Sequence, residues 1–200
     1  MKIYLIRHAL SVSNMHNIWT GQTDVDLSED GIREQREICG KYSYPKAELC
    51  VSSPLRRCTH SLEIIYGKKP DITMPKFMEC SLGILEGRSY TNLNDDPNYI
   101  SWIGSPDTAL PGGESFSHFT KRAEKGFSEM LEMMRERRIN SASVMLHGNV
   151  MRAILHRFAD TYIPHSEWKI PNGGLYKLDL SDDGKVLSYT QEPDFLFSSN

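Results

Sequence analysis

Residues 2–11 read KIYLIRHALS. The β-branched and aromatic run over 2–7 predicts a short buried strand, and the small and polar residues from His8 onward end it. A second apolar run, ASVMLH over 142–147, also ends in a histidine, His147. Open α/β sheets bind their ligands beyond the carboxyl ends of their strands, so both histidines are expected at the ligand-binding edge of one sheet.

Strands and helices alternate over most of the chain. Further strands are predicted over 47–52, 174–180 and 185–191, with the Asp182-Asp183-Gly184 turn between the last two. Helices are predicted from the N-cap Ser28 onward, over 54–66, over 115–138 and over 149–160. This alternation favours an α/β fold, a three-layer α/β/α sandwich in which helices cover both faces of a mainly parallel central sheet.

The length of 200 residues fits a single domain over 1–200. Its middle part, 86–113, is rich in Gly, Pro, Asn and Asp, which predicts loops with at most short helices. We expect this segment to be a small cap inserted into the domain. Tyr90, Tyr99 and Trp102 lie within it, which suggests that their rings cover a bound substrate.

The composition excludes several classes of protein. No run approaches the roughly 20 apolar residues that cross a bilayer, and the first ten residues are no signal peptide, so a cytoplasmic protein without a membrane partner is expected. A formal net charge of -3 gives no general attraction to nucleic acid. The cysteines and histidines show no metal-ligand or disulfide spacing, so we expect no metal and no cofactor. The oligomeric state stays open.

Three basic elements each follow a predicted strand: Arg7-His8, Arg56-Arg57 and His147. If the sheet gathers these strand ends, guanidinium and imidazole groups converge in one crevice. Such a cluster is costly without an anion, which predicts a site for a di-anionic phosphoryl group that arginine binds through two N–H donors. Either arginine of the Arg56-Arg57 pair can serve.

Histidine adds what arginine lacks, because a neutral imidazole can attack phosphorus near neutral pH. A phosphohistidine intermediate splits the transfer into two easier steps, and the guanidinium groups stabilise the charge on the phosphoryl oxygens, so the chemistry needs no metal. A loop carboxylate would protonate the leaving oxygen and later accept a proton from water. Glu79 and Glu86 are the candidates.

These residues belong to a longer set of motifs. The set comprises Arg7-His8-Ala9, Asn14, Thr20-Gly21, Ser53-Pro54-Leu55-Arg56-Arg57, Glu79 with Gly83 and Glu86-Gly87, Pro111-Gly112-Gly113-Glu114-Ser115, and His147-Gly148. In this order it resembles the histidine phosphatase superfamily, specifically its phosphoglycerate-mutase-like branch, over residues 3 to about 174. A single Arg-His or His-Gly pair says little, whereas the ordered set is specific.

The resemblance implies that His8 is the nucleophile that becomes phosphorylated. It implies that Arg7, Arg57 and His147 complete the phosphate pocket, and that Arg57 rather than Arg56 is the pocket arginine. Glu79 matches the proton donor. The further positions that the resemblance assigns to phosphate or substrate binding are Asn14, Thr20, Gly21 and Gly148. Asn172-Gly173-Gly174 is expected to lead into a late strand of the mainly parallel sheet.

Some residues depart from the family pattern. Ala9 stands where the family usually has Gly, and Leu10 and Ser11 replace an acidic residue and a Thr. Cys80-Ser81-Leu82-Gly83 replaces the basic residue and Tyr-Gly of the mutases, and the chain is shorter than typical mutases, which favours a phosphatase.

The sequence therefore predicts a metal-independent phosphomonoesterase that works through a phosphohistidine at His8 on a small phosphorylated metabolite. A ribazole phosphate, a phosphosugar and phosphoserine all remain open as substrates. One alternative is a phosphoglycerate-type mutase. A second is a non-catalytic phosphate-sensing or protein-binding module on the same fold.

Overall fold

The computed structural model describes residues 1–89, 91, 93–159, 161, 163–181 and 183–198. Tyr90 and Asp182 thus lie outside the described residues. The described part forms a six-stranded sheet in the order β3-β2-β4-β1-β5-β6. The strands are β1 (Lys2–Arg7), β2 (Leu49–Ser52), β3 (Ile72–Thr73), β4 (Ser141–Leu146), β5 (Leu175–Leu180) and β6 (Val186–Glu192).

Strands β3, β2, β4 and β1 are mutually parallel, and β5 pairs antiparallel with both β1 and β6. This confirms the mainly parallel sheet. The described α-helices are α1 (Val12–Met15), α2 (Glu29–Lys41), α3 (Arg56–Tyr66), α4 (Pro97–Gly104), α5 (Phe116–Glu136), α6 (Gly148–Phe158) and α7 (Asp194–Phe197). Short 3₁₀ turns occur at η1 (Pro75–Phe77), η2 (Gly83–Leu85) and η4 (His165–Glu167).

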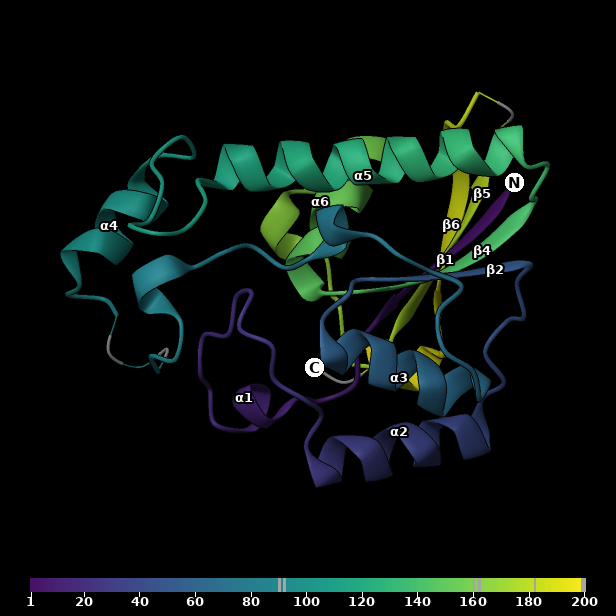
Figure 1. Cartoon of the computed structure of the whole chain (residues 1–200), viewed down its shortest axis with the longest axis horizontal. Helices are drawn as coiled ribbons and strands as arrows, with labels where there is room; N and C mark the ends of the chain where they lie inside the picture. Colours follow the sequence, from purple (N-terminus) through teal and green to yellow (C-terminus); the bar gives the residue numbers. More distant parts are fainter. Residues whose placement is uncertain (90, 92, 160, 162, 182, 199–200) are drawn as a thin grey trace.

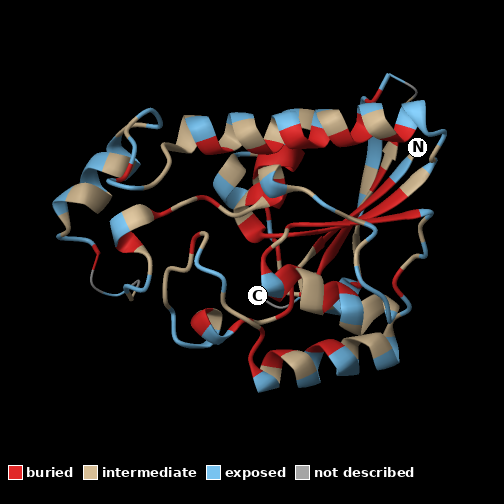
Figure 2. Ribbon diagram, in the orientation of Figure 1, coloured by how far each residue is buried: buried red, intermediate tan, exposed pale blue. Residues whose placement is uncertain are grey.

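Helices cover both faces of the sheet, as predicted: α5 and α6 lie on one side, and α2 and α3 on the other (Figure 1). Alternate residues of β1 pack into two hydrophobic cores, one on each face of the sheet, because successive strand side chains point to opposite faces. Ile3 and Leu5 belong to the cluster with α5 and α6, whereas Tyr4 and Ile6 belong to the cluster with α3. Figure 2 shows the central strands β1, β2 and β4 as a mostly buried band between these layers.

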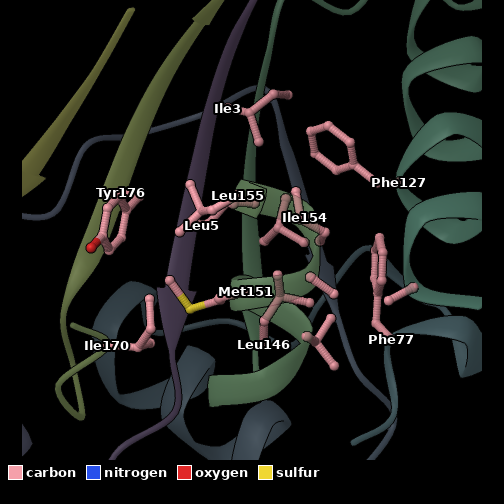
Figure 3. Packing of buried hydrophobic residues seen from close by; sticks show 14 of the residues in the cluster. Ile3, Leu5, Phe77, Phe127, Leu146, Met151, Ile154, Leu155, Ile170 and Tyr176 are labelled. Atoms are coloured by element: carbon pink, nitrogen blue, oxygen red, sulfur yellow. The ribbon is translucent and has the colours of Figure 1, made fainter. Parts of the chain in front are cut away.

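The larger core lies between the sheet and the α5–α6 pair. In Figure 3, Leu5 and Leu146 of the sheet pack against Met151 and Ile154 of α6, with Phe127 of α5 beyond them. These residues are at most 1% exposed. At about 1.5–3 kcal/mol for each fully buried large apolar side chain, this packing fixes α6, and with it the His147-Gly148 corner, against the sheet.

Local signals explain where the helices start. Ser28 caps α2 by accepting a hydrogen bond from the backbone N–H of Gly31, as the sequence predicts. Helix α3 begins at Arg56, two residues later than Pro54, which corrects the predicted start. The N–H of Ser53 still bonds to the carbonyl of Met145 in β4, and the chain bends at Pro54 and Leu55 before helical geometry sets in.

The segment 86–113 contains α4, which Asp96 caps through the N–H groups of Asn98 and Tyr99. Tyr99 and Trp102 pack against Trp19, with ring centroids 5.8 and 6.0 Å away. In Figure 1 this segment lies at the same end of the molecule as α1, away from the N-terminus. Among the described helices, none is both long and apolar enough to cross a membrane.

Candidate active site

The ends of parallel strands bring the predicted site residues together. Arg7 pairs with Leu146 in the β1–β4 register, and the N–H of His8 bonds to the carbonyl of Leu146. The next residue after Leu146 is His147. The two imidazole rings consequently lie edge to face, with centroids 5.2 Å apart and planes at 65°.

His8 is held with one ring nitrogen engaged and the other turned away. Its Nδ1 lies 2.6 Å from the carbonyl oxygen of Ala9. Because a carbonyl only accepts, Nδ1 carries the proton of the neutral ring, and Nε2 keeps its lone pair. Burial, followed by the charges of Arg57 and Arg7, holds the pKa of His8 well below 6.5. The ring is therefore neutral and nucleophilic at neutral pH.

The Ala9 position fits this arrangement although the family usually has Gly there. The N–H of Ala9 donates to the Ser61 hydroxyl at 2.9 Å, and that hydroxyl donates to the Arg57 carbonyl at 2.6 Å. The carboxamide of Asn172 donates to the His8 carbonyl at 2.8 Å. The loop after β1 is thereby tied to α3 on one side and to the entrance of β5 on the other.

Arg57 joins His147 to the loop that precedes α2. Its Nε donates to His147 Nδ1 at 3.2 Å, and Nη1 and Nη2 donate to the carbonyls of Thr23 and Gly21 at 3.0 and 2.8 Å. These bonds use three of the five N–H groups of a guanidinium, which leaves two for an anion. The side chain is buried, because Arg57 is 2% exposed.

Arg56 faces the other way. Its guanidinium contacts Asp24 at 3.5 Å, and its side chain is 61% exposed. It is not among the residues that line the pocket, whereas Arg57 is. The structure thus places Arg57, not Arg56, beside the histidines, because the first turn of α3 points one of the two consecutive side chains inward and the other to solvent.

Glu79 and Glu86, the two candidate carboxylates, have different surroundings. Glu79 lines the pocket, and its carboxylate accepts hydrogen bonds from the N–H groups of Cys80 at 2.8 Å and Asn149 at 3.2 Å. Glu86 instead binds the loop before α2 through the N–H groups of Gln22 and Thr23, at 2.9 and 2.8 Å. Glu79 therefore lies at the pocket, whereas Glu86 holds the loop before α2.

Arg122 of α5 fixes the Glu79 segment from behind. It forms a two-pronged ion pair with Glu114, with N–O distances of 2.8 and 2.7 Å, and donates to the carbonyls of Met78 and Glu79 at 2.9 and 3.1 Å. Glu114 in turn accepts from the N–H of Ser81 at 3.0 Å. These contacts of Glu114 give the motif over 111–115 a structural role. No pattern in the sequence indicated the role of Arg122, apart from its helical spacing in α5.

A pocket of about 260 Å³ lies between these groups. The predicted site residues that line it are Arg7, His8, Asn14, Thr20, Gly21, Arg57, Glu79 and Gly148, and the remaining one, His147, lies in ring contact behind His8. The sequence did not predict the lining residues Ser11, Trp19, Cys80, Leu82, Asn149 and Arg152. Asn149 and Arg152 follow Gly148 within about one helical turn, so helical periodicity could have indicated them.

Asn14 has its carboxamide oxygen held by the Ser11 hydroxyl at 2.8 Å, in the capping box of α1. This orients the carboxamide so that its amino group remains to donate to a ligand.

The thiol of Cys58 lies 3.4 Å from His147 Nε2, and burial raises its pKa to about 12. Cys58 is therefore a packed, unreactive thiol despite its neighbour Arg57.

Comparison with known proteins agrees with this geometry. The sequence model of the histidine phosphatase superfamily (branch 1) matches residues 3–192. The chain belongs to this superfamily. A histidine phosphatase of this branch acts through a histidine, which agrees with the neutral, pocket-lining imidazole of His8.

Within the histidine phosphatase superfamily the chain is similar to both mutases and phosphatases. It is 26% identical to a 2,3-bisphosphoglycerate-dependent phosphoglycerate mutase of Cytophaga hutchinsonii, over 96% of this chain and 94% of that protein. It is 25% identical to the adenosylcobalamin/alpha-ribazole phosphatase of Escherichia coli, over 78% of each. Its fold matches the crystal structure of the alpha-ribazole phosphatase from Shigella flexneri with a TM-score of 0.79 at 21% identity, covering 94% and 95% of the two chains.

Proposed function

We propose that this histidine phosphatase is a metal-independent phosphomonoesterase that hydrolyses a small phosphorylated metabolite through a phosphohistidine at His8. The observation that supports it most strongly is the edge-to-face pair of His8 and His147, with Arg57 bonded to the second ring. This geometry supports a site in which a nucleophile, a neutral imidazole and a cation surround one point. The pocket volume of about 260 Å³ suits a phosphoryl group with a small leaving group.

In the first step, His8 Nε2 forms a bond to phosphorus while the ester P–O bond breaks. The leaving oxygen takes a proton from the carboxyl group of Glu79, and the leaving group departs as an alcohol. In the second step, water attacks phosphorus, Glu79 accepts the water proton, and the N–P bond breaks. Inorganic phosphate is released and His8 returns to its neutral form.

Arg7 and Arg57 bind the phosphoryl oxygens in both steps. Their guanidinium groups stabilise the charge that spreads over the equatorial oxygens, which is the task that metal ions perform in other phosphoryl-transfer enzymes. Both are pre-positioned, since Arg7 Nη1 donates to the Ile170 carbonyl at 2.5 Å and Arg57 donates to Gly21 and Thr23. Asn14 and the N–H groups at the start of α6 add donors, as is usual for anions at helix N-termini.

The experiment is hydrolysis of an aryl phosphate by the wild-type protein, with and without a chelator. We expect turnover that the chelator leaves unchanged, and a His8→Ala variant that loses it together with an acid-labile phosphoenzyme. His16→Ala is the matched control, because His16 is exposed and does not line the pocket. Phosphate binding without any turnover would instead indicate the non-catalytic module.

A phosphoglycerate-type mutase is the second candidate, and the identity to the Cytophaga hutchinsonii mutase favours it. A mutase must re-transfer the phosphoryl group to a bound acceptor before water attacks. Monophosphoglycerate supplied with its bisphosphate primer distinguishes the two. Isomer exchange faster than phosphate release would replace the phosphatase proposal.

We further propose that 86–113 acts as a cap on a single domain and that its aromatic residues cover the leaving group. Trp19 lines the pocket, and Tyr99 and Trp102 pack on Trp19. A Trp102→Ala variant is expected to raise KM. Ile100→Ala on the same helix is the control, because Ile100 is 50% exposed. Unchanged kinetics of the Trp102 variant on every substrate would remove the cap from the mechanism.

A further inference from the structure

Arg152 is a third guanidinium group in the pocket, and the mechanism above gives it no task. It lies on α6, about one turn after Gly148. Its Nε donates to the carbonyl of Trp168 at 3.2 Å, and its Nη1 donates to the carboxamide oxygen of Asn149 at 3.2 Å. Both partners are neutral acceptors, so the positive charge of Arg152 is oriented but not balanced.

Arg152 lies beside one of the two phosphoryl arginines, Arg7, at the start of α6. A Cβ atom added at Gly148 would lie 3.6 Å from Arg7 Cζ and 3.7 Å from Arg152 Nη1, so these two guanidinium groups flank the start of α6. Arg7 and Arg152 also hold neighbouring carbonyls, those of Ile170 and Trp168. Arg57 lies on the side of His147.

Glu79 places the leaving group on the side of Arg152. One carboxylate oxygen of Glu79 accepts from the N–H of Asn149, and the side chain of Asn149 accepts from Arg152. The proton donor to the leaving oxygen and the third guanidinium therefore share a neighbour in the first turn of α6. A substituent on the leaving alcohol that extends past Glu79 comes to Arg152.

The charges around the pocket support an anionic substituent. Among the residues that the structure describes, neither Arg57 nor Arg152 has a carboxylate within ion-pair distance, and Glu79 is the lone acidic residue that lines the pocket. Burial together with the charge of Arg152 lowers the pKa of the nearby His165 to about 4, so His165 is neutral at neutral pH and adds no charge beside Arg152.

We propose that Arg152 is a specificity-determining residue that binds a second anionic group, a carboxylate or a second phosphate, on the alcohol part of the substrate. This rests on the proposed function, because the role of Glu79 in that function locates the leaving group. Nη2 of Arg152 has no hydrogen-bond partner among the described residues, and it remains to donate to this group.

The test compares phosphoglycolate with its uncharged amide, two esters of the same size that differ by one carboxylate. We expect the wild-type protein to prefer phosphoglycolate in kcat/KM by at least about tenfold, the usual effect of one charge-assisted hydrogen bond. Arg152→Gln is expected to bring this ratio close to one while the amide is still hydrolysed. Arg157→Gln removes the same charge from the last turn of α6, where its side chain is 64% exposed, and is expected to keep the ratio.

Other outcomes are equally decisive. A wild-type protein without preference, or an Arg152→Gln variant that slows both esters equally, overturns the assignment and leaves the phosphatase intact. If the glutamine variant does not fold, Arg152→Met, which keeps the aliphatic stem, replaces it. If neither ester is hydrolysed, hydrolysis of the aryl phosphate decides the proposed function separately. The Kd values of the same two compounds then decide the role of Arg152, and equal values overturn it.

Discussion

The hydroxyl of Ser53 lies 2.8 Å from Nε2 of His147, and both residues are fully buried. The other ring nitrogen, Nδ1, accepts a hydrogen bond from Arg57, which can only donate. The proton of the neutral ring therefore lies on Nε2 and is donated to Ser53. Burial, then the charges of Arg57 and His8, lowers the pKa of His147 well below 6.5, so this neutral tautomer persists at neutral pH.

Ser53→Ala is expected to reduce kcat about tenfold, because the ring of His147 loses the contact that fixes its tautomer and orientation. The free energy of unfolding should fall by about 1–3 kcal/mol, since a buried N–H is left unpaired. Ser143→Ala is the matched control: its hydroxyl is buried and bonded to Tyr66 at 2.8 Å, far from the histidines. It should lose stability and keep kcat. A Ser53 variant with wild-type kcat would separate Ser53 from catalysis.

Glu79→Gln is expected to slow the hydrolysis of alkyl phosphates by about 10²–10⁴, the usual contribution of general acid–base catalysis. Phosphorylation of His8 by an aryl phosphate should change far less, because a phenolate-type leaving group needs no proton. Rapid-quench measurement of phosphoenzyme formation with both esters checks this difference. Equal losses on the two substrates would show that Glu79 does not act as the proton donor.

Glu86→Gln should give a different signature. Its carboxylate organises the backbone of residues 22–23 and Leu82 rather than a reacting proton. We expect lower stability and a raised KM for both ester types, with no selective loss on alkyl phosphates. Thermal unfolding and steady-state kinetics on the same ester pair test it, and a selective loss on alkyl esters would transfer the acid role from Glu79 to Glu86.

The strands and the main helices could be predicted because each has a strong local signal. The apolar run over 2–7 coincides with β1, and the periodic stretch 115–138 contains α5. By contrast, the sequence did not predict β3 or α1. Strand β3 has two residues and exists through its pairing with β2, and the four-residue α1 rests on the reciprocal bonds of Ser11 and Asn14. Elements this short depend on tertiary contacts and leave no periodicity to detect.

The motifs predicted the residues that gather at the pocket, whereas the groups that orient these residues were not predicted. Arg122 holds the Glu79 segment largely through backbone carbonyls, which any sequence supplies. The helical spacing of Arg152 from Gly148 could have indicated its place, but not its orientation, since one of its two partners is the Trp168 carbonyl. The family resemblance favoured Glu79 over Glu86, but the residue pattern alone left both open, because it does not show which way two loop carboxylates point.

Gly21→Ala is expected to disrupt the wall of the pocket. Gly21 has φ of +51°, and an added Cβ would lie 2.1 Å from Glu86 Oε1. Relief of this clash must move Glu86 or the Gly21 carbonyl that Arg57 contacts. Gly67→Ala is the control, because its φ is +68° but nothing lies within 4 Å of its Cβ, so it reports backbone strain alone, about 1 kcal/mol. We expect Gly21→Ala to lose more stability than this and to raise KM. Equal destabilisation and unchanged kinetics would contradict the wall assignment.

The buried or half-buried histidines His8, His147 and His165 should make stability fall on acidification. Their folded pKa values lie below the unfolded value of 6.5. The unfolded chain therefore binds more protons below that pH, and the free energy of unfolding decreases as the pH falls from about 6.5 towards the folded pKa values. Each such histidine contributes up to about 1.4 kcal/mol per pH unit. Denaturant unfolding between about pH 7 and pH 5 measures this slope.

The His8→Asn variant tests whether His8 contributes to this pH dependence of the free energy of unfolding. It removes one titrating ring, so the loss of stability between about pH 6.5 and pH 5 should be smaller by up to about 1.4 kcal/mol per pH unit. His16→Asn alters an exposed histidine and should keep the wild-type slope. Because the lowered pKa values of Asp26 and Asp71 start from an ordinary value of 3.8, the contributions of these carboxylates fall below this window. A wild-type slope in the His8 variant would mean that burial and the neighbouring arginines do not lower the pKa of His8 in the folded protein.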